Sequence, residues 1–166
     1  MVQTGTVLGA DLFWSREQVD ALFGEGFVNE WRKTGFVDHG LVEFHWERPA
    51  GSRAWRGAHF SVQAHRLSVD DDCVNPIIQE RYGRLGGPMS YVELAAELDA
   101  RGVAMVELPG SDSDIREFWQ PDSYTVVYVT SGEYYCSGKL GVGDIYRVSS
   151  PHFATPESRE SAAYRH

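Results

Sequence analysis

The distribution of apolar positions first predicts a short amphipathic helix over residues 15–23. Three apolar side chains recur at the spacing that places them on one helical face: Val19, Leu22 and Phe23. Ser15 and Gln18, three residues apart, fit a capping box, in which each side chain bonds the backbone amide of the other residue. Gly24 follows at once, and glycine is typical of a helix end.

Two segments then alternate apolar and polar residues with a period of two. They cover residues 39–47 and 55–68, and both fit antiparallel strands that are buried on one side only. A link rich in proline, glycine and serine over residues 49–52 predicts a hairpin loop between them. The acidic run at residues 70–72 predicts a charged turn after the second strand.

The second half of the chain predicts one more helix and further strands. Ser90 and Glu93 fit a second capping box, and Gly102 fits the end of that helix. Runs rich in β-branched, aromatic and other apolar residues predict strands at residues 103–108, 124–130 and 142–148, the first of them buried. Residues 133–136, between the last two of these runs, are a candidate for a further short strand.

Together these elements predict an α+β fold in a single domain over residues 1–148. We expect one mostly antiparallel, twisted sheet with two helices packed on one face, and more strand than helix. Residues 149–166 contain two prolines and many small polar residues, so we expect a loose C-terminal tail.

Composition fits a globular protein without a membrane segment. The chain has 166 residues, of which 42% are hydrophobic, and no apolar run approaches the roughly 20 residues that span a bilayer. The N-terminus lacks the basic and hydrophobic regions of a secretion signal, so we expect a cytoplasmic protein. Cys73 and Cys136 are too few for a disulfide scaffold; two reduced thiols are expected, with one disulfide as the alternative.

The net charge of −9 is concentrated in the second half of the chain. Residues 86–146 hold ten acidic side chains against three basic ones, whereas residues 48–84 hold six arginines against four acids. Such a field repels nucleic acid and anionic membranes and accelerates encounter with a basic partner. The charge therefore favours a protein partner and argues against binding to nucleic acid or a membrane.

Three histidines are the main candidates for chemistry. His45, His59 and His65 lie on the polar sides of the two predicted strands, and pairing of the strands would bring His45 close to one of the others. With Glu43 or Glu47, such a group would suit zinc or iron. However, His59 and His65 would stand roughly 20 Å apart along a strand, too far to share a metal. A polar sheet face without a metal is the favoured interpretation.

The sequence gives weaker support to nucleophilic catalysis and to phosphate or anion binding. Cys73 follows three acidic residues, whose charge would raise the pKa of its thiol, and no serine lies in a G-x-S-x-G elbow. The glycine-rich segment 138–144 lacks the order of a phosphate-binding loop and precedes a strand, so it predicts a hairpin turn. A pocket for a small anion among the arginines of residues 48–66 remains an alternative. We assign no catalytic residue, no metal and no cofactor.

Surface recognition is the remaining function class. Large aromatic residues mix with acids around residues 112–122, and aromatic anchors with a charged rim are typical of protein interfaces. A core position is the favoured interpretation for Phe118 and Trp119, and a merely solvated surface loop is the favoured interpretation for the acidic residues before them. The candidate partner-binding residues are Asp112, Asp114, Glu117, Trp119 and Asp122.

The segments 118–128 (FWQPDSYTVVY) and 141–146 (GVGDIY) carry a family resemblance. Together with the early W-S-R-E-Q helix start, they make the chain similar to small actinobacterial immunity proteins of polymorphic toxin systems, including the immunity factor of the mycobacterial NAD-glycohydrolase necrotizing toxin. The resemblance implies a protein that binds a cognate secreted toxin with a basic cleft and covers its active site, and an NAD glycohydrolase is the candidate toxin. The alternative is a small ligand- or metal-binding domain or enzyme that uses the histidine-bearing sheet face.

Overall fold

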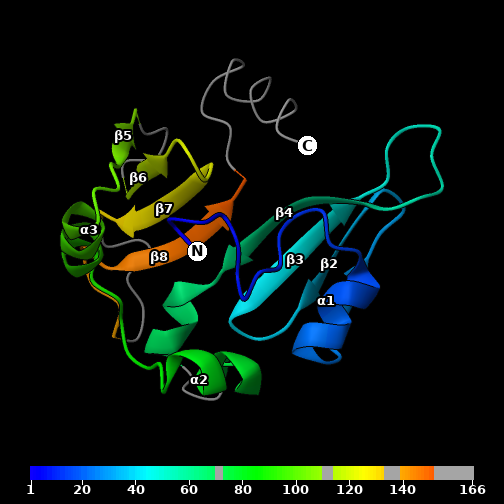
Figure 1. Ribbon diagram of the computed structural model, residues 1–166, viewed down its shortest axis with the longest axis horizontal. Helices are drawn as coiled ribbons and strands as arrows, with labels where there is room; N and C mark the ends of the chain where they lie inside the picture. The colour runs from blue at the N-terminus through cyan, green and yellow to red at the C-terminus, as the bar shows by residue number, and fades with distance from the viewer. Residues whose placement is uncertain (70–72, 110–113, 133–138, 152–166) are drawn as a thin grey trace.

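A computed structural model describes residues 1–69, 73–109, 114–132 and 139–151 (Figure 1). It confirms the α+β class and the antiparallel sheet. The strands are β1 (Phe27–Glu30), β2 (Thr34–Asp38), β3 (Val42–Glu47), β4 (Arg56–Val62), β5 (Val106–Leu108), β6 (Ile115–Gln120), β7 (Thr125–Thr130) and β8 (Ile145–Ser150). The helices are α1 (Arg16–Phe23), α2 (Pro76–Tyr82), α3 (Tyr91–Ala100) and the 3-10 helix η1 (Ala64–Ser68). In the part of the chain described, no helix is long and apolar enough to span a bilayer.

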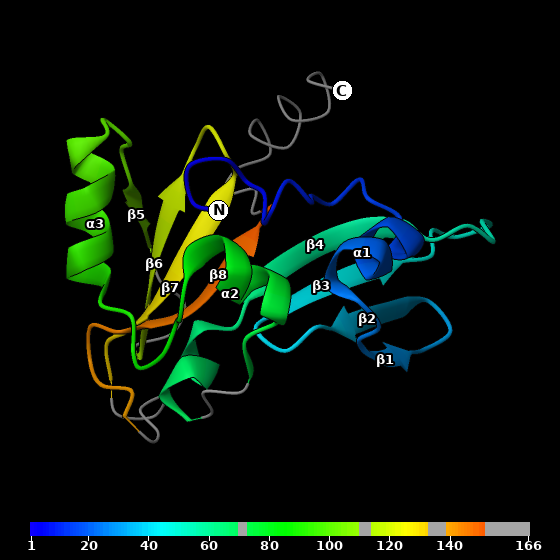
Figure 2. The same ribbon diagram turned by 60° about the horizontal axis from the view of Figure 1, so that its bottom comes forward.

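The sheet consists of two four-stranded meanders. Its strand order is β1-β2-β3-β4-β8-β7-β6-β5, so β1–β4 and β5–β8 each run in sequence and meet through their last strands. The β4–β8 contact has three residue pairs, from Phe60↔Ser150 to Val62↔Val148. A helix precedes each meander in the chain, α1 before β1 and α3 before β5. Figures 1 and 2 show β6–β8 crossing the direction of β3 and β4, so the sheet is strongly twisted.

All three α-helices pack on the same face of the sheet. Val62 pairs with Val148, Val148 with Val127, and Val127 with Phe118, and cross-strand partners point to the same side. Helices α1 and α2 bury side chains in one cluster on this side, and α3 does so in a second. Figure 2 shows α3 at the β5–β6 end of the sheet and α1 beside β3 and β4. We call this the covered face, and the opposite side the open face.

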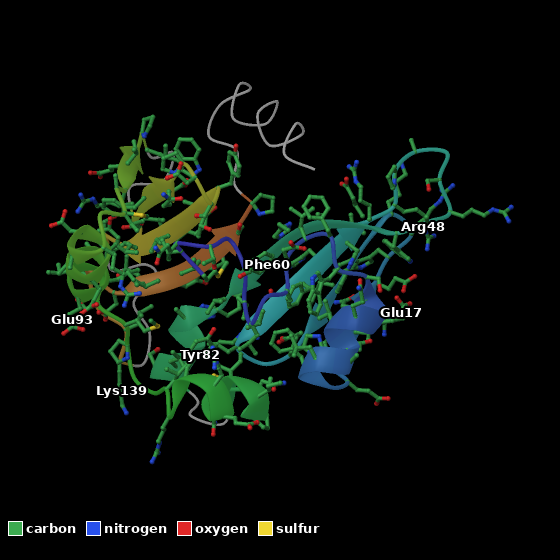
Figure 3. All side chains as sticks on the ribbon, in the orientation of Figure 1. Glu17, Arg48, Phe60, Tyr82, Glu93 and Lys139 are labelled. Carbon is green, nitrogen blue, oxygen red and sulfur yellow. The ribbon has the colours of Figure 1, made fainter. Side chains whose placement is uncertain are left out.

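Aromatic stacking organises both cores of the covered face. Phe60 is fully buried, lies near the middle of the molecule (Figure 3), and stacks on Phe44 with ring centroids 5.3 Å apart. Phe23 of α1 reaches Phe44 at 5.6 Å. In the other cluster, Tyr91 of α3 stacks on Phe118 at 4.0 Å. Helices α1 and α3 are therefore each fixed to the sheet by a ring contact with a residue that the strand pattern turns inward.

The two predicted capping boxes have different outcomes. At α1, the Gln18 amide donates to Ser15 Oγ at 3.3 Å and the Ser15 amide donates to Gln18 Oε1 at 2.8 Å, which confirms the first box. At α3, Ser90 is the N-cap residue but its side chain makes no capping bond, so the second box is wrong. The backbone of Ser90 instead forms an isolated bridge to Asp144, which fixes this residue against the turn before β8.

Several predicted strand limits are corrected by the structure. Residues 64–68 form η1 rather than the end of a strand, because the chain turns where β4 meets the edge of the other meander. In residues 103–108, only 106–108 form a strand, and this edge strand is largely exposed instead of buried. The last strand runs to Ser150, two residues into the predicted tail. The predicted strand at 133–136, the turn at 70–72 and the tail beyond 151 lie outside the described residues.

Candidate functional site

The open face carries aromatic and ionic side chains along the whole width of the sheet. Residue pairing across the strands places them on one side, because Phe36 pairs with His45, His45 with His59, and Tyr128 with Arg147. This face lies opposite the three helices and their apolar cores. Its chemically distinctive residues are Phe36, Glu43, His45, His59, Glu117, Trp119, Tyr128 and Arg147.

A ladder of rings crosses the open face in the β1–β4 half. Trp31 lies 6.0 Å from Phe36, Phe36 lies 5.2 Å from His45, and His45 stacks on His59 at 4.1 Å, measured between ring centroids. The expected approach of His45 to a second histidine is therefore confirmed. His65 is not part of the ladder, because it lies in η1 and stacks on Tyr146 at 4.4 Å.

Desolvation, and then neighbouring positive charges, disfavour a charge on His59. The pKa of His59 is lowered to about 4, first by desolvation and then by the positive charges of His45 and Arg147, against a weaker opposing effect of Glu43. Part of the His59 side chain nevertheless remains exposed. His59 is thus a neutral, accessible imidazole at pH 7, and its ring nitrogens can donate and accept one hydrogen bond each.

Glu43 joins the histidine ladder to a network around Arg66. Its carboxylate lies 3.4 Å from His45 Nε2 and accepts a hydrogen bond from Gln63 Nε2 at 2.7 Å. Burial opposes the charge of Glu43, but the bonds from His45 and Arg66 outweigh it and lower the carboxyl pKa. Arg66 also holds both Asp38 oxygens, at 2.8 and 2.9 Å. Arg66 therefore ties η1 to β2 and β3 and has its charge fully compensated.

Arg147 lies on the open face, and its partners differ from those of Arg66. Its guanidinium carbon lies 4.5 Å from the centre of the Tyr128 ring, a cation–π contact. Its Nε atom is shut off from solvent and has no hydrogen-bond partner. Among the described residues, no carboxylate forms an ion pair with Arg147.

The structure separates the five predicted partner-binding residues. Glu117 and Trp119 share the open face, where Glu117 pairs with Tyr128 and Trp119 is half-buried. Asp114 lies at the start of β6, where its side chain packs against Gly132. Asp122 is exposed and lies beyond the other end of β6, a six-residue strand roughly 20 Å long at about 3.3 Å per residue. Asp112 lies outside the described residues.

The remaining predictions for this region concern core packing and the glycine-rich turn. Phe118 points to the covered face and is buried, as expected for a core residue. The described part of the turn, residues 139–144, precedes β8, and Thr130 holds it through a bond from the Gly143 amide at 2.8 Å. This confirms a hairpin turn. Within the described residues, no three His, Cys, Asp or Glu side chains gather as metal ligands.

Sequence reasoning missed a groove on the covered side of the sheet. A cavity of about 590 Å³ lies between the start of α1 and strands β1–β4. Three tryptophans contribute to its wall: Trp14, Trp46 and Trp55. Trp46 Nε1 donates to the Trp14 carbonyl at 3.3 Å, which joins the helix entry to the sheet. The tryptophans themselves are visible in the sequence, but their convergence depends on the pairing of β2, β3 and β4.

Comparison with known proteins yields little similarity. No protein-family model matches the chain, and no curated protein matches it. Among solved structures, it matches the crystal structure of a DUF4309 family protein, YjgB, from Bacillus subtilis, with 13% identity over 85% of this chain and 80% of that chain. The TM-score is 0.35, so this likeness carries no argument about fold or function.

Proposed function

We propose that this protein is an immunity protein, which binds a cognate secreted bacterial toxin in the cytoplasm and inhibits it by covering the toxin's active site. The observation that carries the proposal is the open face, a wide sheet surface with aromatic and ionic side chains on the side away from the helices. The family resemblance of residues 118–128 and 141–146 supports the same function.

The composition of the open face suits a protein interface. Tryptophan, tyrosine and arginine are enriched among the residues that dominate binding energy, and the open face presents Trp119, Tyr128 and Arg147 on neighbouring strands. These side chains are held by a hydrogen-bonded sheet. Little conformational entropy is therefore lost when a partner binds, which favours affinity.

Net charge supports the choice of partner. A charge of −9 accelerates encounter with a basic domain, and toxins that cleave NAD or nucleic acid hold phosphates in positive clefts. The open face itself contains both signs of charge, including Glu117 and Arg147. We infer that the overall field governs the association rate, whereas the aromatic side chains of the open face determine how long the complex lasts.

The proposal is tested with the toxin domain encoded beside this gene in its native host. Co-expression should rescue growth, and calorimetry should show a stable complex. Trp119→Ala and Tyr128→Ala should each weaken binding by roughly tenfold to a hundredfold, as expected for interface anchors. Val92→Ala is the matched control, because Val92 is 74% exposed on α3, outside the open face.

Thermal melting separates binding from folding. The variants should melt within a few degrees of the wild type, because Trp119 and Tyr128 lie outside the two buried clusters. Absence of both rescue and binding would refute the immunity proposal. Undiminished binding by both open-face variants would refute the choice of interface.

A ligand-binding domain is the second candidate function. The specific observation in its favour is the stacked pair His45–His59 on the open face, with a Glu43 carboxylate oxygen 3.4 Å from His45 Nε2. Binding of a small ligand at this position without any effect on toxin activity would favour this candidate.

A further inference from the structure

The two edges of the sheet differ in what they present to solvent. Strand β5 has three residues, and its middle residue, Glu107, is bound to Arg116 by two hydrogen bonds of 2.8 and 2.9 Å. At the other edge, three apolar side chains are exposed in or next to β1: Phe27 to 68%, Val28 to 40% and Trp31 to 55%. Edge strands of soluble monomers are usually kept short or protected by charges, so the β1 edge is suited to pairing with another strand.

The outward hydrogen-bonding groups of β1 follow from its pairing with β2. The Trp31 amide donates to the Thr34 carbonyl at 2.8 Å. Bonded and non-bonded residue pairs alternate along an antiparallel ladder, so Asn29 also bonds to β2. The N–H and C=O groups of Val28 and Glu30 therefore point away from β2. Within the described part of the chain, no strand lies beyond β1 (Figure 2), so these groups are available to an added strand.

We propose that β1 pairs antiparallel with β1 of a second copy of this chain, with a two-fold axis between the two Asn29 residues. In this register, the backbone of Val28 bonds to that of Glu30 in the second copy. Phe27 lies opposite Trp31 of the second copy on the open face, in a non-bonded pair, where side chains approach most closely. The pair occurs twice by symmetry, and opposed aromatic side chains attract each other. The contact closes on itself and leaves neither β1 edge free.

The residues on either side of Asn29 favour this register over its neighbours. Glu25 precedes β1 and Lys33 follows it, so the pairing brings opposite charges together at both ends of the contact. A shift of two residues in one direction places Glu30 opposite Glu30 of the second copy, which is repulsive. The same shift in the other direction places Trp31 opposite Glu25 and separates the two aromatic residues. The self-complementary pattern therefore fits a second copy of this chain in one register.

Sedimentation equilibrium of the full chain measures the association. We expect a reversible dimer with a dissociation constant on the order of 10 µM, as befits a contact smaller than the standard interface. Val28→Pro should weaken the dimer roughly a hundredfold, because proline lacks the outward N–H, while the bonds of β1 to β2 do not use that amide. Trp31→Ala should weaken it roughly tenfold. Tyr82→Ala is the matched control, because Tyr82 is 57% exposed on α2, away from β1, and should leave the dimer unchanged.

Two charged variants at one position test the register. In the proposed register, Val28 lies opposite Glu30 of the second copy. Val28→Lys should therefore dimerise roughly tenfold or more tightly than Val28→Glu, because two attractive contacts replace two repulsive ones. Added salt should narrow this difference. If Val28 lay opposite Val28 of the second copy instead, both substitutions would place like charges together and weaken the dimer alike.

The outcomes that contradict the proposal are separate from those for toxin binding. The amide spectrum of each variant reports whether the sheet remains folded, and Trp31→Ala tests the contact should Val28→Pro unfold. A wild-type chain that stays monomeric up to about 0.5 mM, or an undiminished dimer in folded Val28→Pro or Trp31→Ala, would overturn the proposal. Equal affinities of Val28→Lys and Val28→Glu would overturn the register. Since Trp119 and Tyr128 lie in the other meander, the dimer and the immunity proposal can fail independently.

Discussion

Acid should destabilise this protein through His59. The folded pKa of His59 is about 4, below its ordinary value of 6.5, so the unfolded chain binds more protons at every pH between these values. The stabilising contribution is therefore present in full above pH 6.5, and it is lost progressively as pH falls towards 4. Substitution by glutamine removes the titrating group but keeps a polar side chain of similar length.

The size of the effect follows from the pKa displacement. A fall from 6.5 to about 4, at about 1.4 kcal/mol per pH unit, sets an upper limit of about 3 kcal/mol. The His59 side chain is partly exposed, and solvent screening reduces such interactions, so we expect roughly 1–2 kcal/mol. This amount is a substantial part of the stability of a small domain.

Urea denaturation at several pH values between 7 and 4 measures the effect. The comparison uses the change of unfolding free energy with pH, because loss of the His45 stack shifts the absolute stability of His59→Gln. The wild type should lose roughly 1–2 kcal/mol more than the variant across this interval. Parallel pH profiles for the two proteins would show that His59 does not titrate with a lowered pKa, and the reasoning would be refuted.

Three further predictions concern packing and capping. Phe60→Ala should lower the unfolding free energy by about 3–5 kcal/mol, whereas Val92→Ala should change it by less than about 0.5 kcal/mol. Equal melting temperatures of the two variants would contradict the assignment of Phe60 to the core. Gly57→Ala places a Cβ 1.7 Å from the Leu12 carbonyl oxygen, so we expect a loss of about 1–3 kcal/mol in chemical denaturation, and wild-type stability would disprove the contact. Asn75→Ala removes the α2 cap and a bond to the Phe23 carbonyl, so the urea midpoint should fall by the equivalent of about 1–2 kcal/mol; an unchanged midpoint would argue against both bonds.

Elements with strong local signals were predictable from sequence. The capping box of α1 involves only Ser15 and Gln18, and both of its bonds form within four residues of chain. Strand β3 alternates strictly between buried and half-buried positions, because the covered core lies on one side of it. Such elements need no knowledge of the partner strand.

The missed elements lack that one-sided pattern. In β1, Phe27 and Val28 are both exposed, at 68% and 40%, because the strand lies at the sheet edge. Strand β6 is buried on both sides, at Ile115 and Phe118, so its alternation is weak and residues 115–120 resembled an interface segment. Helix α2 was readable in principle, because Asn75 followed by proline is a common helix start.

The candidate site depends on long-range pairing. The stack of His45 on His59 requires the β3–β4 register, which shifts at an irregularity beside His45. Arg147 reaches the same face only because β8 pairs with β4, and no local pattern of residues predicts that pairing. The sequence therefore suggested the histidine pair but did not reveal Arg147, and it grouped Asp114 and Asp122 although β6 separates them.

The three-pair junction of β4 and β8 has a consequence for local unfolding. Each meander closes its own cluster of buried side chains, so amide hydrogen exchange should proceed in two blocks, one for β1–β4 and one for β5–β8. The slowest amides of the two blocks should differ in exchange rate. A protein bound across the junction would stabilise both blocks at once. Amide exchange would then also slow in strands that the bound protein does not contact.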